Sequence, residues 1–226
     1  RFAEWRIELS LSIETIIDEI HARRIFDSRG LDTIEVEVST YGGFGSAGAP
    51  AGKSTGKFEV VSYPDGGVSK AVKLVSRLVP PKLIGMNADE QEAIDQLLCK
   101  IDGSANLSKI GGNTSIAISL AVAEAAASSH GIPLFQHLGG VAATELPHPL
   151  GNVLGGGKHA GGKAPDIQEF LAIPVKAGSF TQAAESNILV HRSVRERIEK
   201  VDGTFTGGKG DEGAWAPNLG NEEALE

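Results

Sequence analysis

One stretch decides how this sequence folds: Gly155-Gly156-Gly157-Lys158-His159-Ala160-Gly161-Gly162, followed after three residues by Asp166-Ile167-Gln168-Glu169-Phe170. Glycine has no Cβ, so the first run allows the backbone to close around a small ligand. The second run places one carboxylate in a short apolar segment, and loops on a rigid scaffold often carry chemistry. The same pattern is also typical of a surface loop followed by an ordinary strand, so the rest of the chain has to decide between the two.

Composition narrows the classes of protein to which the chain can belong. Its 226 residues are 41% hydrophobic and 22% charged, which is typical of one or two globular domains. The formal net charge of −8 argues against nucleic acid as a partner, because proteins that bind a phosphate backbone concentrate Lys and Arg. It does not exclude a small anionic ligand, since a few local groups outweigh the global charge.

The apolar runs predict no membrane segment, and the single cysteine predicts a reducing compartment. The longest apolar run, from Ile116 to Ala127, is short and is interrupted by Ser119 and Glu124. Cys99 has no partner for an internal disulfide, and it lies in an apolar helical pattern. We therefore expect a core residue at Cys99 and a cytoplasmic protein.

Hydrophobic periodicity predicts alternating groups of helices and strands. The expected helices cover residues 11–20, 68–79, 94–101, 114–130 and 180–200, with a further helix beginning at 221. The expected strands cover residues 33–39, 150–154 and 167–173, with a turn at 41–45 and glycine-rich loops at 46–56 and 203–213.

Three of these helices have recognisable ends or faces. The 114–130 helix is apolar nearly all round, so it should be deeply packed, with Asn113 or Thr114 as its N-cap. Ser179 is the expected N-cap of the 180–200 helix, and Pro80-Pro81 should stop the 68–79 helix. Glycines and prolines between 139 and 149 mark a domain junction, which divides the chain into residues 1–145 and 146–226. Residues 1–12 look like an atypical extension.

A phosphate-binding loop is one alternative for Gly52-Lys53-Ser54-Thr55. The P-loop pattern needs a glycine at position 47, where this sequence has alanine. Pro50 also removes a backbone N–H from the expected phosphate cradle. The sequence therefore disfavours an NTPase.

Five segments together resemble the enolase family, whose members dehydrate 2-phosphoglycerate in glycolysis. They occur in the family's order and near its spacing, and they cover most of the chain after about Ile13. The variants Gly-Gly-Lys-His-Ala-Gly and Gly-Asp-Glu-Gly-Ala-Trp-Ala-Pro are most similar to archaeal-type enolases. The five segments are residues 22–30, 50–56, 97–113, 156–170 and 210–218.

The resemblance implies an α/β protein with two parts. A small α+β N-terminal domain (residues 1–145) would precede the first part of an enolase-type (β/α)8 barrel (residues 146–226), which is incomplete in this chain. A barrel of this type needs ~250 residues. In barrel enzymes the active site lies at the carboxyl ends of the strands, and Glu169 and the loop carrying Glu212 would lie there.

The chemistry of the reaction matches residues in these segments. Removing a proton beside a carboxylate builds up negative charge, which Mg²⁺ offsets, and expelling hydroxide needs a carboxyl group that is kept protonated. By resemblance, Glu212 is the acid that assists hydroxide loss and Glu169 is its partner at the substrate. Gln168 contacts the substrate, His159 closes over its phosphate end, and Ser54 reaches a second Mg²⁺ when the site closes.

The residues alone also allow interpretations of these positions that involve no catalysis. Glu212 could merely cap a turn, and a lone loop histidine such as His159 is most often solvated. Alternation along a strand points Gln168 and Glu169 to opposite faces, so both touch substrate only if the backbone turns near the strand end. Lys53 departs from the small residue usual in the family beside Ser54.

The family's main Mg²⁺ ligands and its catalytic lysine belong to later strands, which this sequence does not contain. We expect the 226-residue chain alone to be inactive and prone to self-association, as either a fragment or one part of a split enzyme. The alternatives are a non-catalytic enolase-fold assembly or binding protein, or a related barrel enzyme acting on another carboxylate. The family implies 2-phosphoglycerate and phosphoenolpyruvate as ligands, gluconeogenesis as a second pathway, and a homo-oligomer, either dimer or octamer.

Overall fold

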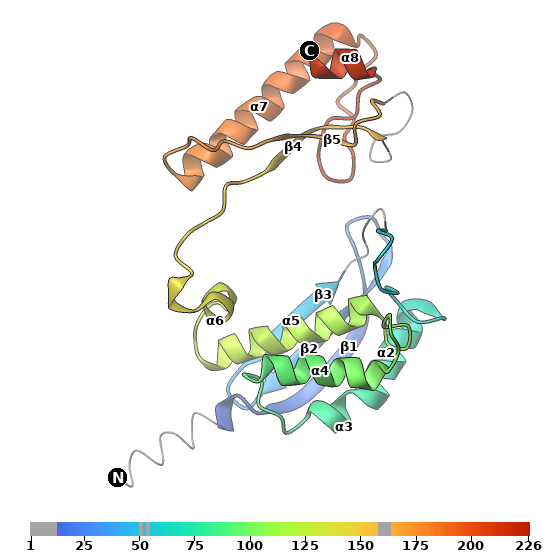
Figure 1. The fold of residues 1–226 in the computed structure, drawn as a ribbon, viewed down its shortest axis with the longest axis vertical. Coiled ribbons are helices and arrows are strands. Elements are labelled where there is room, and N and C mark those ends of the chain that lie inside the picture. The colour runs from blue at the N-terminus through green and yellow to red at the C-terminus, as the bar shows by residue number, and fades with distance from the viewer. Residues whose placement is uncertain (1–12, 50–51, 53–54, 158–163) are drawn as a thin grey trace. The chain divides into compact units, whose positions relative to one another are not determined.

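The computed structural model describes residues 13–49, 52, 55–157 and 164–226. The chain divides into two compact units, with the boundary in the sequence between Ala143 and Thr144 (Figure 1). Each unit has its own buried cluster of apolar side chains, so each is described by itself.

The first unit is built on a three-stranded antiparallel sheet in the order β1-β2-β3. The strands are β1 (Ile17–Phe26), β2 (Asp32–Thr40) and β3 (Phe44–Ala49). In β2 the branched side chains at 34, 36 and 38 are buried, while Glu35 and Glu37 alternate with them and pair with Arg23 of β1. The alternation of apolar and charged residues therefore predicted this strand correctly.

Two predictions for the first fifty residues are wrong. The helix expected at 11–20 does not continue to its end, because β1 begins at Ile17 and takes its last four residues, and a bulge between Ile17 and Glu19 shifts the strand's register. Because of this shift Ile17 and Ile20, three residues apart, are both buried, and their spacing imitates a helix. The expected loop at 46–56 begins instead with the last four residues of β3.

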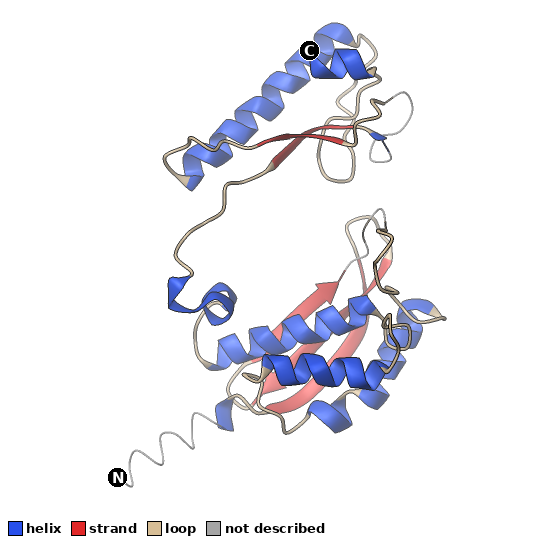
Figure 2. Ribbon diagram, viewed as in Figure 1, coloured by secondary structure: helices blue, strands red, loops and turns tan. Residues whose placement is uncertain are grey.

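Helices lie over one face of this sheet (Figure 2). They are α2 (Gly67–Leu78), α3 (Pro80–Leu83), α4 (Gln91–Asp102) and α5 (Gly112–Ser129). The short helix α6 (Leu134–Gly139) and the 3₁₀ turn η1 (Gly140–Ala142) follow α5. The periodicity located α2, α4 and α5 correctly. Pro80 and Pro81 end α2 as expected, but they also open the short helix α3, because proline is tolerated in a first helical turn.

Helix α5 is the buried centre of this unit, as its apolar surface predicted. Its N-cap is Gly111 and not Asn113 or Thr114. Carbonyls of the loop between β3 and α2 already satisfy its first N–H groups, because Gly112 N donates to Val61 O and Asn113 N to Ser62 O. No single helix among the described residues is long and apolar enough to cross a membrane. The pair formed by α5 and residues Leu134–Ala142 reaches that length and composition only with a 97° bend.

Cys99 is exposed, so the expectation of a core cysteine is wrong. The buried side of α4 is formed by Ile94, Leu98 and Ile101. Cys99 follows Leu98 directly, and one residue turns a helix by about 100°, which carries its side chain away from the core.

Asp102, at the end of α4, organises the loop that leads to α5. Its buried carboxylate accepts hydrogen bonds from the Ser104 hydroxyl and from the backbone N–H groups of Ser104, Lys109 and Ile110. Burial raises the pKa of the Asp102 carboxyl, but these hydrogen bonds outweigh it and hold the pKa below its usual value of 3.8. The carboxylate is therefore the stable form in the folded protein.

We expect Asp102→Asn to destabilise the first unit by about 1–3 kcal/mol at pH 7, because an amide cannot accept all of these hydrogen bonds. A carboxyl with a lowered pKa contributes its full stability above the unfolded value of 3.8, and this contribution is lost as pH falls toward the folded value. Urea unfolding should therefore show a smaller difference between variant and wild type near about pH 3 than at pH 7. The exposed Asp65→Asn is the control, and an equal difference at both pH values would contradict this role.

The second unit contains a two-stranded antiparallel sheet and one long helix. The strands β4 (Gly151–Gly155) and β5 (Glu169–Ala172) precede α7 (Phe180–Val201) and α8 (Asn221–Leu225). The Ser179 hydroxyl accepts a hydrogen bond from Gln182 N, which confirms the predicted N-cap of α7. The described residues of this unit form no closed barrel, as expected for the first part of one.

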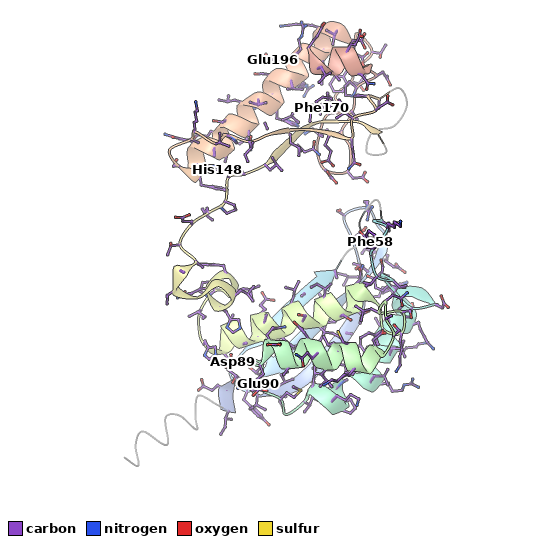
Figure 3. The ribbon with its side chains drawn as sticks, viewed as in Figure 1. Phe58, Asp89, Glu90, His148, Phe170 and Glu196 are labelled. Carbon is purple, nitrogen blue, oxygen red and sulfur yellow. The ribbon has the colours of Figure 1, made fainter. Side chains whose placement is uncertain are left out.

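A small apolar core holds α7 against β4. It contains Leu154, Ile198, Trp215 and Leu219, and the partly buried Phe170 of β5, labelled in Figure 3, packs against it. The segment around Trp215 runs parallel to β4, with Gly155 N donating to Trp215 O at 2.9 Å and Trp215 N to Val153 O at 3.1 Å. β4 therefore lies between β5 and this segment, which follows the turn carrying Glu212.

Candidate functional site

Glu212 lies in a tight turn, Gly210-Asp211-Glu212-Gly213. Gly213 N donates to Gly210 O at 3.0 Å, and Gly210 N donates to Ala214 O at 2.9 Å. Gly213 has a φ of 82°, in the left-handed region that favours glycine. The two hydrogen bonds therefore close the backbone of the turn, and the Glu212 side chain is exposed.

His191 of α7 contacts the last residue of this turn, Gly213. Its ring Nε2 lies 3.1 Å from Gly213 O, so in the tautomer protonated at Nε2 it donates to that carbonyl. The ring stacks on Trp215 with centroids 4.4 Å apart, and Trp215 Nε1 donates back to His191 O at 2.8 Å. Arg195 and Lys209 lie over the same indole ring. The backbone at Glu212 is thus tied to the long helix.

The side chain of Glu212 contacts β4. Asn152 Nδ2 donates to Glu212 Oε2 at 3.1 Å, between residues sixty positions apart in the chain. Glu169 is the first residue of β5, is half-buried, and pairs with Gly155 at the other end of β4. The structure therefore attaches both predicted acids to one strand, from its two sides.

Gln168 lies just before β5 begins and is exposed. Its Nε2 donates to Glu169 Oε1 at 3.4 Å, so the side chains of these neighbouring residues meet. Regular strand alternation would separate them. The backbone therefore departs from strand geometry at Gln168, which is the condition under which both side chains can face one ligand.

His159 and Ser54 lie outside the described residues, but the described chain on either side of the His159 segment is tightly held. Gly156 N donates to Gln168 O at 2.8 Å and Gly157 N to Pro165 O at 2.7 Å. A Cβ at Gly156 would lie 2.0 Å from Ile167 O, so only glycine fits there. Hydrogen bonds therefore hold the end of β4 close to the residues that lead into β5.

The chain before Ser54 is also held. The carbonyl oxygen of Ala49, the last residue of β3, accepts hydrogen bonds from the Thr33 hydroxyl at 2.5 Å, the Tyr63 hydroxyl at 3.1 Å and Asn113 Nδ2 at 3.1 Å. These donors come from β2, from the loop before α2 and from the first turn of α5. Three parts of the first unit thus converge on the residue at which the glycine-rich loop departs.

Asp202 organises the loop between α7 and the Glu212 turn. It accepts hydrogen bonds from the Thr204 hydroxyl at 2.6 Å, from Thr204 N at 2.9 Å and from Asn218 N at 3.2 Å. The Thr204 hydroxyl is the main cause that lowers the pKa of the Asp202 carboxyl. An aspartate followed by Gly203-Thr204 is a common turn pattern, so this contact could have been predicted from the sequence.

The Mg²⁺ implied by the resemblance is not accounted for by the described residues. Among residues 13–49, 52, 55–157 and 164–226, no group of three or more His, Cys, Asp or Glu side chains could hold a metal ion. The described residues therefore do not by themselves fit a metal centre.

Comparison with known proteins gives matches that cover most of the chain. Residues 17–138 match the family model described as "Enolase, N-terminal domain", and residues 143–226 match "Enolase, C-terminal TIM barrel domain". The enolase of Methanosphaera stadtmanae is 54% identical over 95% of this chain and 52% of its own length. The enolase of Methanothermobacter thermautotrophicus is 52% identical over 95% and 51%, and that of Pyrobaculum aerophilum 44% over 92% and 51%. The chain thus spans about half the length of these curated relatives.

Proposed function

This chain belongs to the enolase family, and from that premise we propose that it forms the first half of an enzyme that reversibly dehydrates 2-phosphoglycerate to phosphoenolpyruvate. Residues 1–145 would be its N-terminal domain and residues 146–226 the start of its catalytic barrel. One observation carries the proposal: Glu212 and Glu169 are attached to the same strand, through Asn152 and through pairing with Gly155. By family, the protein works in cytoplasmic glycolysis and gluconeogenesis as a homo-oligomer, with Mg²⁺.

In this proposal the side chains divide the work of breaking the C3–O bond. Once the C2 proton is removed, the electrons left on C2 form the C2–C3 double bond, and the C3–O electrons leave with the oxygen. Glu212 gives its proton to that oxygen, so water departs and a carboxylate remains. Glu169 and Gln168 contact the substrate from the start of β5. His159 closes over the phosphate.

Bound Mg²⁺ would supply positive charge against the carboxylate of the deprotonated substrate, with Ser54 reaching the second ion in the closed state. The base that takes the C2 proton and the main metal ligands belong to barrel strands that this sequence does not contain. A test of activity therefore has to supply those strands.

A chimera tests the function directly. Residues 17–226 would replace the matching half of the Methanosphaera stadtmanae enolase, whose remaining half supplies the later strands. We expect the chimera to convert 2-phosphoglycerate to phosphoenolpyruvate when Mg²⁺ is added, measured by ultraviolet absorbance. The 226-residue chain assayed alone should show no turnover.

The outcomes separate the competing proposals. A folded chimera without turnover, beside an active parent enolase, would contradict the catalytic proposal and favour a non-catalytic assembly or binding protein. Activity on another carboxylate but not on 2-phosphoglycerate would favour a related barrel enzyme. Turnover by the 226-residue chain alone would contradict the assignment of essential groups to later strands.

A further inference from the structure

Asn152 makes a contact that the family match does not explain. Its Nδ2 donates to Glu212 Oε2 at 3.1 Å, while its Oδ1 is buried and has no hydrogen-bond partner among the residues that the structure describes. A buried acceptor without a partner costs free energy, so such an atom usually has a role. Here it belongs to the same amide that touches the proposed acid.

An amide can form a hydrogen bond with a carboxyl group in either protonation state of that group. A carboxylate only accepts hydrogen bonds, whereas a protonated carboxyl also donates one. Turning the Asn152 amide over about its terminal bond exchanges Nδ2 and Oδ1. The amide then accepts from the protonated acid with the oxygen that is otherwise unpaired.

We propose that Asn152 is the positioning residue of Glu212, because its amide hydrogen-bonds to the Glu212 carboxyl group and can do so both before and after proton transfer. The proposal rests on the proposed function in assigning the acid role to Glu212. Before the proton is transferred, Asn152 Oδ1 accepts from the Glu212 O–H, and this O–H then turns from Asn152 to the departing oxygen to deliver its proton. After the proton has moved to the departing oxygen, Nδ2 donates to the carboxylate, which is the arrangement in this structure.

The backbone around Asn152 and Glu212 is fixed by other contacts. β4 is held by Gly155 N donating to Trp215 O at 2.9 Å and by Trp215 N donating to Val153 O at 3.1 Å. The Glu212 turn is held separately, by the closure of its own backbone and by His191 at Gly213 O. Changing the Asn152 side chain should therefore remove the amide and leave both backbones in place.

Asn187 offers a matched control in the same unit. Its Nδ2 donates to Pro149 O at 2.9 Å, and its Oδ1 is also buried without a partner among the described residues. It has the same chemistry as Asn152, but its amide donates to the backbone of Pro149. Asn187→Leu thus reports the cost of losing such an amide without losing the contact with the acid.

The first experiment measures the contact in the 226-residue chain and does not depend on activity. A double-mutant cycle of Asn152→Leu and Glu212→Ala, followed by urea unfolding, should give a coupling of about threefold or more in the unfolding constant. The cycle of Asn187→Leu with Glu212→Ala should give none. Additive effects of Asn152→Leu and Glu212→Ala would overturn the proposal, whether or not the chimera is active.

The second experiment measures the consequence for catalysis in the chimera. Asn152→Asp keeps the shape of asparagine but cannot donate to a carboxylate, so kcat should fall about tenfold or more with little change in KM. A space-filling role would survive this isosteric change, so an unchanged kcat would overturn the proposal. An inactive parent chimera would instead contradict the proposed function and leave the unfolding cycle as the decisive test of Asn152.

Discussion

Replacing Glu212 by glutamine in the chimera should nearly abolish dehydration of 2-phosphoglycerate and leave exchange of its C2 proton with solvent largely intact. Glutamine keeps the size of the side chain but cannot deliver a proton to the departing hydroxide. General acid catalysis of this kind typically contributes a factor of about 100 to 10,000, so the rate of phosphoenolpyruvate formation should fall by that factor. Proton exchange, by contrast, needs only the base and the stabilised carbanion.

The two rates can be measured on one sample, with deuterium incorporation at C2 followed by NMR. Glu222→Gln is the control, because Glu222 is an exposed residue in the first turn of α8 and should affect neither rate. If exchange stops as completely as product formation, Glu212 acts before the carbanion forms and the acid assignment is wrong. If neither rate changes, Glu212 is only a turn residue.

Local patterns were sufficient where a segment's own residues determine its structure. In β2, alternating Ile34, Val36 and Val38 predicted a strand with one buried face, and Ser179 predicted the start of α7. The pattern failed for β1, because a bulge makes a spacing of three residues compatible with a strand. Bulges depend on pairing with another strand, so a single-segment pattern cannot reveal them.

The residues of the candidate site also differ in whether a local sequence pattern reveals them. Glu212 and Glu169 could be selected from the sequence, because their neighbouring glycines and amides form family motifs. Asn152 and His191 were missed, since each reaches the Glu212 turn from a distant part of the sequence. Asn152 is sixty residues from Glu212, and His191 is twenty-two residues from Gly213. An isolated asparagine in a strand and a histidine in a helix give no local signal of such contacts.

The small residues of β3 were predicted to form the end of a turn at 41–45 and the start of a loop at 46–56, and they are instead required by packing. A Cβ built on Gly45 would lie 2.2 Å from Ala121 O and 2.4 Å from Ala125 N, so β3 touches the backbone of α5. Ser46 N also donates to Glu124 Oε2 of α5 at 2.8 Å, which fixes the strand on the helix. The glycine therefore permits a contact between two backbones and does not indicate a flexible chain.

We expect Gly45→Ala to destabilise the first unit by about 3 kcal/mol, the upper end of what overpacking usually costs, because backbone atoms of a buried helix cannot move aside. Gly45 is not among the residues with positive φ, so the loss would come from packing and not from backbone strain. Urea unfolding of the 226-residue chain measures it.

Gly48→Ala is the matched control in the same strand. Its Cβ would lie 3.3 Å from Cδ1 of Ile25, the far end of a flexible side chain, which can shift by a few tenths of an ångström. We expect a change within about 1 kcal/mol for this variant, since alanine also lowers the entropy of the unfolded chain. Equal effects of the two substitutions would mean that β3 can move away from α5. In that case the three hydrogen bonds on Ala49 O would not hold the start of the Ser54 loop in a fixed place.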